Sequence, residues 1–248
     1  MSNLSDIGFP VQTEEEFAIL LEQAYESGHH LDTESGFYVR YADLSGAELW
    51  LQFDHERELI GMNPHFRGSS RVKVGLVSPV LRPQSQLDGA WFAWANPIDP
   101  TDPESGDFPF VFDTPDFLLQ QGVEYPGEYT FQLTAFSQEI AYYETEEEFA
   151  DAQAMEEIPF APQSFIPVGL FGEEKNESPD AFALLTGKVL AAEKRKNQLS
   201  GQWFLWTKLS TLGVVIDLVV DPLDLDVSPQ AGGIIQCQAW LSGQVVKE

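Results

Sequence analysis

The sequence predicts a mainly β protein, α+β overall, in which two related antiparallel barrel-like units follow one another along the chain. Two observations support this fold class. The nonapeptide QLDGAWFAW at residues 86–94 returns as QLSGQWFLW at 198–206, and short apolar runs separated by Gly, Pro, Asp and Asn surround both copies. Such runs are typical of small closed barrels or sandwiches, and a repeat of this length indicates an internal duplication.

The correspondence extends beyond the two nonapeptides, since other positions match in the same order: Gly75 with Gly187, Gln132 with Gln236, Ala135 with Ala239, and Phe136 with Trp240. We therefore expect four segments: an N-terminal helix and strand module at 1–70, an acidic barrel-like unit at 71–144, a linking helix and Pro-rich linker at 145–180, and a second barrel-like unit at 181–248. In strand rhythm the units are OB-like, a likeness of pattern that carries no function by itself.

The first module begins with a helix at 13–27. Thr13 and Glu16 make a capping box, further acidic residues fill the first turn, and Gly28 follows the last turn. Two strand-like runs rich in aromatic and branched residues follow between 36 and 54. The polar segments on either side of these runs, SGHHLDTESG and GMNPHFRGSSR, are typical of a turn and a loop.

Each repeat unit holds four or five strand-like runs. They lie at 71–79, 89–95, 108–113, 128–137 and 140–143 in the first unit, and at 184–193, 201–210, 214–221 and 233–242 in the second. Proline-rich residues 97–109 predict a surface loop, and residues 156–181 predict a linker packed across the surface. The hexapeptide TEEEFA, which starts the first helix, returns at 145–150 and predicts a second helix with the same capping chemistry.

The repeated string is apolar on both faces of its strand. Successive side chains of a strand point to opposite faces, and in both copies each set is aromatic or aliphatic. A strand with one solvated face would alternate apolar and polar residues, so each copy is expected to be covered on both sides. We expect the units to pack together through their tryptophans, namely Trp91, Trp94, Trp203 and Trp206.

Charge is distributed unevenly along a chain whose net charge is −27. Residues 83–174 contain 19 carboxylates and neither Lys nor Arg, whereas residues 175–248 hold 7 basic and 8 acidic side chains. An acidic stretch of this length presents a negative field that repels phosphate backbones and attracts cations or a basic protein surface. Solubility alone is the simpler explanation of the same excess.

Several classes of protein are not expected. The one cysteine, Cys237, lies in an apolar strand-like run without a nearby histidine, which predicts a buried residue and not a reactive thiol. No apolar run approaches the ~20 residues of a membrane-spanning helix, and the N-terminus lacks the pattern of a signal peptide. We therefore expect a cytoplasmic protein with no membrane partner.

The four histidines cluster in the N-terminal module. His55 and His65 with Glu58 or Asp54 would give a transition metal two imidazoles and a carboxylate, and would make the chain a metal-assisted hydrolase. The spacing matches no established metal motif, and ordinary surface or capping histidines are the alternative. The acidic loop at 97–109 offers oxygen ligands for calcium but lacks the EF-hand register. These patterns require no cofactor and assign no catalytic residue.

His65, Arg67 and Arg71 gather in one polar segment and form a candidate ligand-binding set. Their guanidinium groups are suited to hold a carboxylate or a phosphate in bidentate geometry. They are equally suited to pair with carboxylates of the acidic stretch. We favour this internal pairing in a chain that has so few cations.

The basic triplet Lys194, Arg195 and Lys196 precedes the second aromatic string. Exposed aromatic rings beside basic side chains are how many single-strand-binding proteins hold nucleic acid. Such a role requires the aromatic rings of that string to be exposed. It is not the leading hypothesis, because the chain is strongly acidic and the first unit lacks the triplet.

With its segments SGAELWLQ, PHFRG, QLTAFS and GGIIQCQAWLSG, the whole chain resembles members of an uncharacterised family of bacterial proteins. The resemblance implies a bacterial origin and carries over neither an activity nor a site residue. The leading hypothesis is a non-catalytic interaction or ligand-binding protein that presents residues 83–174 to a basic protein partner. A metal-assisted hydrolase and a single-stranded nucleic-acid binder are the two alternatives.

Overall fold

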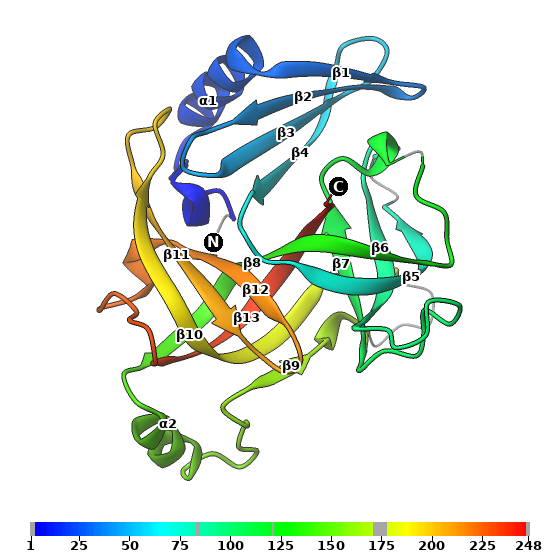
Figure 1. Ribbon diagram of the computed structural model, residues 1–248. Coiled ribbons are helices and arrows are strands. Elements are labelled where there is room, and N and C mark those ends of the chain that lie inside the picture. The colour runs from blue at the N-terminus through cyan, green and yellow to red at the C-terminus, as the bar shows by residue number, and fades with distance from the viewer. Residues whose placement is uncertain (1–2, 83–84, 121, 171–177, 247–248) are drawn as a thin grey trace.

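The computed structural model of the chain describes residues 3–82, 85–120, 122–170 and 178–246. Within these residues the protein is mainly β, as the sequence predicts, with two α-helices and two β-sheets (Figure 1). Helix α1 and the smaller sheet lie above the larger sheet, and helix α2 projects from the opposite end of the molecule (Figure 1). No helix in the described residues is long and apolar enough to span a membrane.

Helix α1 (Glu14–Ser27) begins as predicted. The Glu16 backbone N–H donates to Thr13 Oγ1 over 3.1 Å, and the Thr13 N–H donates to Glu16 Oε2 over 3.2 Å, so the capping box is confirmed. The helix is followed by an antiparallel sheet whose strands pair in chain order: β1 (His29–Thr33), β2 (Gly36–Ala42), β3 (Ala47–Phe53) and β4 (Leu59–Phe66).

Strands β1 and β4 correct the prediction of a turn before residue 36 and of a loop after residue 60. Strand β1 is polar because it lies at the edge of the sheet, with most of its side chains in solvent. Strand β4 pairs along its whole length with β3, and its polar residue His65 is buried against polar partners from distant strands. Neither situation produces the apolar alternation on which strand prediction depends.

The larger sheet contains nine strands in the described residues: β5 (Val72–Leu81), β6 (Gly89–Ala95), β7 (Pro109–Thr114), β8 (Gly127–Tyr143), β9 (Ser164–Ile166), β10 (Phe182–Lys196), β11 (Trp203–Ser210), β12 (Val215–Val220) and β13 (Ile234–Val245). The aromatic strings form the equivalent strands β6 and β11. Helix α2 (Glu146–Gln153) starts at the cap Thr145, whose Oγ1 accepts the Glu148 N–H over 3.1 Å. Residues 97–108 form a loop without a regular strand, as predicted.

The two units pair their strands in the same pattern. In the first, β5 pairs with β6 and β8, and β6 pairs with β7; in the second, β10 pairs with β11 and β13, and β11 pairs with β12, all antiparallel. Each unit then uses the last strand of the other, because β7 runs parallel to β13 and β12 runs parallel to β8. Two rings of pairings result, and both contain β8 and β13.

Strands β8 and β13 also pair with each other, antiparallel, along most of their length. In this pair Phe136 lies opposite Trp240, and their ring centroids are 5.1 Å apart. These two residues correspond in the repeat, so they lie where the two units are related by an approximate two-fold rotation. This pair of corresponding positions is therefore also a pair of neighbours in space.

Both faces of the aromatic strings are covered, with one exception. Trp91 and Leu205 belong to the apolar core inside the rings, whereas Phe204 and Trp206 pack in a second cluster with residues of α1 and the smaller sheet. The N-terminal module thus covers the outer face. The exception is Trp203, whose side chain is 47% exposed. Cys237 is buried as predicted, and burial raises the pKa of its thiol to about 12.

Candidate functional site

A chain of buried hydrogen bonds joins the N-terminal module to both repeat units. His65 of β4 is fully buried, with Nδ1 2.8 Å from Ser242 Oγ and Nε2 3.0 Å from Gln132 Oε1. An amide oxygen only accepts, so Nε2 carries the imidazole proton and the Ser242 hydroxyl donates to Nδ1. Burial lowers the pKa of His65, and the carboxylates of Glu48 and Asp116 offset only part of this effect. The histidine is therefore neutral.

Asp217 of β12 continues this chain. It is inaccessible to solvent, and its carboxylate accepts hydrogen bonds from four donors: Gln132 Nε2 at 3.0 Å, Trp206 Nε1 at 2.8 Å, and the backbone N–H groups of Ser69 and Ser70 at 3.3 and 2.8 Å. Two indole or amide side chains and two backbone amides thus replace water around the charge. Gly68 is required here, since a Cβ at this position would lie 2.1 Å from the carboxylate carbon.

Although this network contains Ser, His and Asp, its geometry is structural. The Ser242 hydroxyl and the imidazole are both buried, and none of the cavities described below is lined by either residue. A nucleophile needs access to a substrate, and the groups that would orient the histidine are here saturated by protein contacts. The network holds the smaller sheet against β8, β12 and β13.

Arg67 and Arg71, the other members of the predicted ligand-binding set, do not converge with His65 on one pocket. Arg67 lies 3.7 Å from the buried Glu48, which also pairs with Arg40 and accepts the indole N–H of Trp50. The Arg71 guanidinium donates to the Ser70 carbonyl. Carboxylates of the acidic stretch are paired by two other cations, since Arg82 contacts Asp113 and Lys73 contacts Glu128.

The residues of the predicted metal site have different partners and do not come together as a metal site. His55 is exposed and Nε2 lies 3.0 Å from the Glu34 carbonyl oxygen, whereas His65 is bound to Ser242 and Gln132. Glu58 is exposed. In the residues that the structure describes, no group of three or more His, Cys, Asp or Glu side chains could hold a metal ion.

The three side chains of the basic triplet have two different environments. Arg195 is turned inward, with its guanidinium carbon 4.4 Å from the centroid of the Trp206 ring and 5.3 Å from that of Phe66, and it donates to the Ser45 carbonyl. Lys194 and Lys196 are exposed, and their ammonium groups lie 5.5 and 5.8 Å from the centroid of the Trp203 ring.

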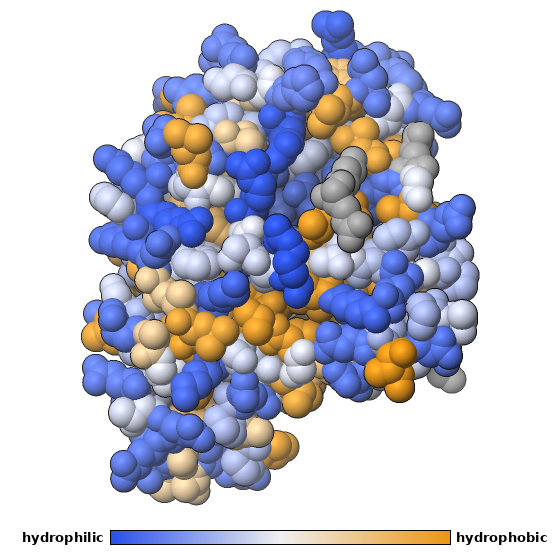
Figure 2. Space-filling view, viewed as in Figure 1, coloured by the Kyte–Doolittle hydropathy of each residue, from blue (hydrophilic) through white to orange (hydrophobic). Residues whose placement is uncertain are grey.

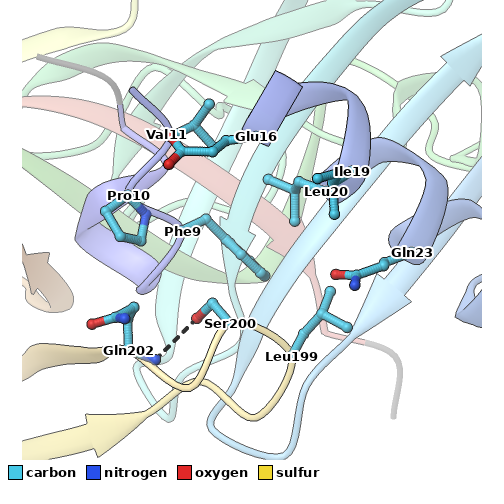
Figure 3. A pocket seen from close by; sticks show the side chains of 10 residues that line it. All are labelled: Phe9, Pro10, Val11, Glu16, Ile19, Leu20, Gln23, Leu199, Ser200 and Gln202. Carbon is cyan, nitrogen blue, oxygen red and sulfur yellow. Dashed lines mark hydrogen bonds between the residues drawn. The ribbon is translucent and has the colours of Figure 1, made fainter. Parts of the chain in front are cut away.

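A groove runs between α1 and the turn of the β10–β11 hairpin (Figure 3). It has a volume of about 220 Å³, and in Figure 3 Ile19 and Leu20 of the helix lie across from Leu199 of the turn. Beside the groove, Asn197 donates to the Ile7 carbonyl and Ser200 donates to the Gly8 carbonyl. The hairpin turn is thereby fastened to the N-terminal segment.

A larger cleft lies against α2, at the end of the molecule opposite α1. Its volume is about 510 Å³, and its apolar lining comes from Phe149 of the helix and from Pro159, Phe160 and Pro162 of the following segment. Gln153 orders this segment, because its side chain accepts the Phe160 N–H over 2.7 Å and donates to Gln236 of β13 over 3.0 Å.

Two carboxylates line the α2 cleft, and other acidic residues are exposed on the same helix and its flanks. Glu146 and Glu156 line it, and the other exposed acidic residues of the helix and its flanks are Glu144, Glu147, Glu148, Asp151 and Glu157. Hydrophilic side chains dominate the α2 lobe in the space-filling view (Figure 2). Met155 and Ile158, which are 87% and 79% exposed, add apolar surface next to these charges. We call this cleft with its carboxylates the α2 surface.

Sequence reasoning missed several residues that the structure brings together. Asp217, Gln132, Ser242 and Glu48 are polar residues within apolar strands, and each is buried with specific partners. The signal in the sequence was a polar residue inside an otherwise apolar strand-like run, which indicates a buried hydrogen-bonding position. The partners were not predictable, since 148 residues separate Asp217 from Ser69 and 177 separate Ser242 from His65.

No family model, curated protein or solved structure matches the chain.

Proposed function

We propose that the protein is a non-catalytic interaction protein whose α2 surface binds a basic segment of a protein partner. The observation that carries this proposal is the apolar cleft of about 510 Å³ whose charged border consists of carboxylates. The cytoplasmic location expected from the sequence is part of the same proposal.

The cleft and its border define the chemistry of the partner. An aliphatic or aromatic side chain would replace water against Phe149 and Phe160, while Lys or Arg residues on either side of it would meet the surrounding carboxylates. Residues 83–174 contain no Lys or Arg, and none of the ion pairs in the described residues involves a carboxylate of the α2 surface, so these carboxylates are available to a partner. Long-range attraction by a net charge of −27 would also speed the encounter with a basic partner.

We also propose that the two repeat units are small OB-like barrels related by duplication. This is supported by the identical order of pairings around both rings, and by the exchange of β8 and β13 between them. The barrels would serve as the rigid support of the α2 surface, because Gln153 connects the helix to β13. A resemblance to an uncharacterised family of bacterial proteins adds no activity to this proposal.

Peptide binding measured by fluorescence anisotropy tests the proposed function. The probe is a short labelled peptide with one central Trp flanked by Arg residues, compared with a peptide in which Glu replaces Arg and one in which Gly replaces Trp. We expect only the first to bind, and its affinity to fall by about tenfold or more between roughly 0.05 and 0.5 M salt. Binding of all three peptides, or no effect of salt, would overturn the proposal.

The repeated hexapeptide provides a matched control. Glu146→Lys on α2 and Glu14→Lys on α1 change the same position of the same TEEEFA sequence; both residues are exposed, and Glu146 lines the cleft. Glu146→Lys is expected to weaken peptide binding by about threefold or more, and Glu14→Lys to leave it within error. Equal effects of both changes would indicate attraction by net charge alone and would reject the α2 surface as the site.

A further inference from the structure

The first tryptophan of the aromatic string occurs in both units, so its surroundings in one unit can be compared with those in the other. In the first unit this residue is Trp91, which is only 3% exposed. The rings of Phe117 and Tyr125 lie 5.9 and 5.4 Å from its ring, and its indole N–H donates to Gln120 Oε1 over 3.0 Å. All three partners come from the segment between β7 and β8. In this fold, then, aromatic rings cover the tryptophan at this position.

The corresponding residue of the second unit, Trp203, lacks such a cover. Its side chain is 47% exposed, and it has no aromatic ring contact with any residue that the structure describes. The segment between β12 and β13 leaves a hollow of about 220 Å³, lined by Lys194 and Leu205 on one side and by residues 228–230 on the other. Lys194 thus borders both the hollow and the Trp203 ring.

Two cations remain available beside this ring. The ammonium groups of Lys194 and Lys196 lie within 6 Å of the Trp203 centroid, and neither forms an ion pair with a carboxylate in the described part of the chain. The other basic residue of the triplet, Arg195, is held by Glu193, Ser45 and Trp206 and supports the strand from its other face.

The hairpin that carries these groups is already ordered. Its turn is bonded to the N-terminal segment through Asn197 and Ser200, and Phe204, the next residue of the string, is completely buried. A ligand that stacked on Trp203 would therefore not have to fold the loop that holds it, which lowers the entropic cost of binding.

We propose that Trp203, Lys194 and Lys196 form a binding site for a planar aromatic anion of the nucleotide class. The base stacks on Trp203 and replaces the two ammonium groups that lie over this ring, and these groups then donate hydrogen bonds to a phosphate group. One ring and two amines match a single nucleotide, either free or as part of a single strand. The acidic surface of the protein does not prevent this, since opposite charges in contact outweigh distant ones beyond a screening length of about 8 Å.

Titration of the intact protein with adenosine diphosphate tests this site. Stacking quenches indole fluorescence, and the contribution of Trp203 is the difference between the wild type and Trp203→Phe. We expect saturable quenching that this variant loses, and binding about tenfold weaker for ribose 5-phosphate, which lacks the base, and for adenosine, which lacks phosphate. Quenching of equal size in Trp203→Phe, or equal affinity for ribose 5-phosphate, would overturn the proposal.

Strand β10 supplies the matched control for charge. Lys194→Glu and Lys188→Glu make the same change on one strand, and both side chains are exposed. Lys194→Glu is expected to weaken nucleotide binding about tenfold or more, while Lys188→Glu leaves it nearly unchanged. Equal effects of the two substitutions, or equal binding of a Glu-rich peptide, would show that the site does not recognise nucleotides.

The two sources of the ligand are separated by a second probe. A short oligodeoxythymidylate that binds more than about tenfold tighter than the mononucleotide, with steeper salt dependence, identifies a single strand as the ligand. Equal affinity of the two probes identifies the free nucleotide. In both cases Trp203→Ala must reduce the affinity, since Phe would still offer a ring for stacking, and a single strand that binds equally well to the alanine variant contradicts the proposal.

Discussion

The two aromatic strings occupy equivalent strands but different surroundings. Trp91 of β6 is enclosed by the rings of the segment that follows β7, whereas Trp203 of β11 stands in solvent between two lysines. The second tryptophans of the two strings, Trp94 and Trp206, also differ, but here the second unit supplies the hydrogen-bond partner. Trp206 donates its indole N–H to Asp217, but the buried N–H of Trp94 has no partner among the described residues. The strand and its pairings are the same in both units, while the groups around it differ.

Removal of the Asp217 carboxylate should have the largest effect on stability, because this group accepts the Trp206 N–H, for which Trp94 has no equivalent partner among the described residues. Asp217→Ala leaves the indole N–H of Trp206 and the backbone N–H of Ser70 buried without an acceptor, and removes one of the two acceptors of Gln132 Nε2, which predicts a loss of about 4 kcal/mol of unfolding free energy. Chemical denaturation measures it.

Asp107→Ala is the control for Asp217→Ala, because Asp107 is an exposed acceptor of the first unit that bonds Asn96. Its effect should stay below about 1 kcal/mol. If the two variants unfold at the same denaturant concentration, the buried network contributes nothing that an exposed hydrogen bond does not.

The comparison of Trp91 with Trp203 can be tested directly by truncation. Trp91→Ala removes a buried ring from the core and should cost about 3–5 kcal/mol, while Trp203→Ala removes an exposed ring and should cost less than about 1 kcal/mol. Denaturant midpoints of the two variants give both values. Similar losses would mean that Trp203 is covered in solution, and the nucleotide site would then lack its stacking surface.

A pH-dependent contribution to stability comes from Asp6 in the N-terminal segment, whose side chain bonds a residue of the second unit. This side chain is 3% exposed and accepts the Asp221 N–H over 3.0 Å; burial raises its pKa to about 8, with further contributions from Asp224 and Asp221. The folded state thus retains a proton that the unfolded state releases near pH 4. The contribution of Asp6 to stability is therefore greatest below about pH 4 and is lost as the pH rises to 8.

Thermal unfolding between pH 5 and 8 checks this prediction. The wild type should lose up to about 1.4 kcal/mol per pH unit relative to Asp6→Asn, which has no proton to release. Parallel pH profiles of the two proteins would show that Asp6 is ionised in the folded state.

Much of the architecture follows from local sequence. The duplicated nonapeptide predicts two equivalent strands with equivalent neighbours, and the repeated TEEEFA sequence predicts the starts of α1 and α2, where Thr13 forms a capping box and Thr145 an N-cap. These features depend on residues close together in the chain. Edge strand β1 and polar strand β4 were not predicted, because many of their side chains are in solvent or bond to residues of distant strands and do not pack in an apolar core.

The candidate sites were less accessible to prediction than the fold. Lys194 and Lys196 were recognised from the basic triplet, but whether Trp203 is covered depends on a segment some 25 residues further along the chain. The α2 surface likewise depends on how residues 156–162 turn back along the helix, which proline-rich sequence does not specify. Histidines and arginines that lay close in sequence found separate partners, because strand pairing and burial decided their neighbours.

The exchange of closing strands has a consequence for the origin of the chain. Each ring is completed by a strand that the other unit supplies, β13 for the first and β8 for the second. A single ancestral unit, with one copy of each strand, could have completed the same pairings only by associating with a second copy around a two-fold axis. Joining the two subunits of such a dimer in one chain would give the pairings seen here, with most carboxylates in one half and the exposed tryptophan in the other.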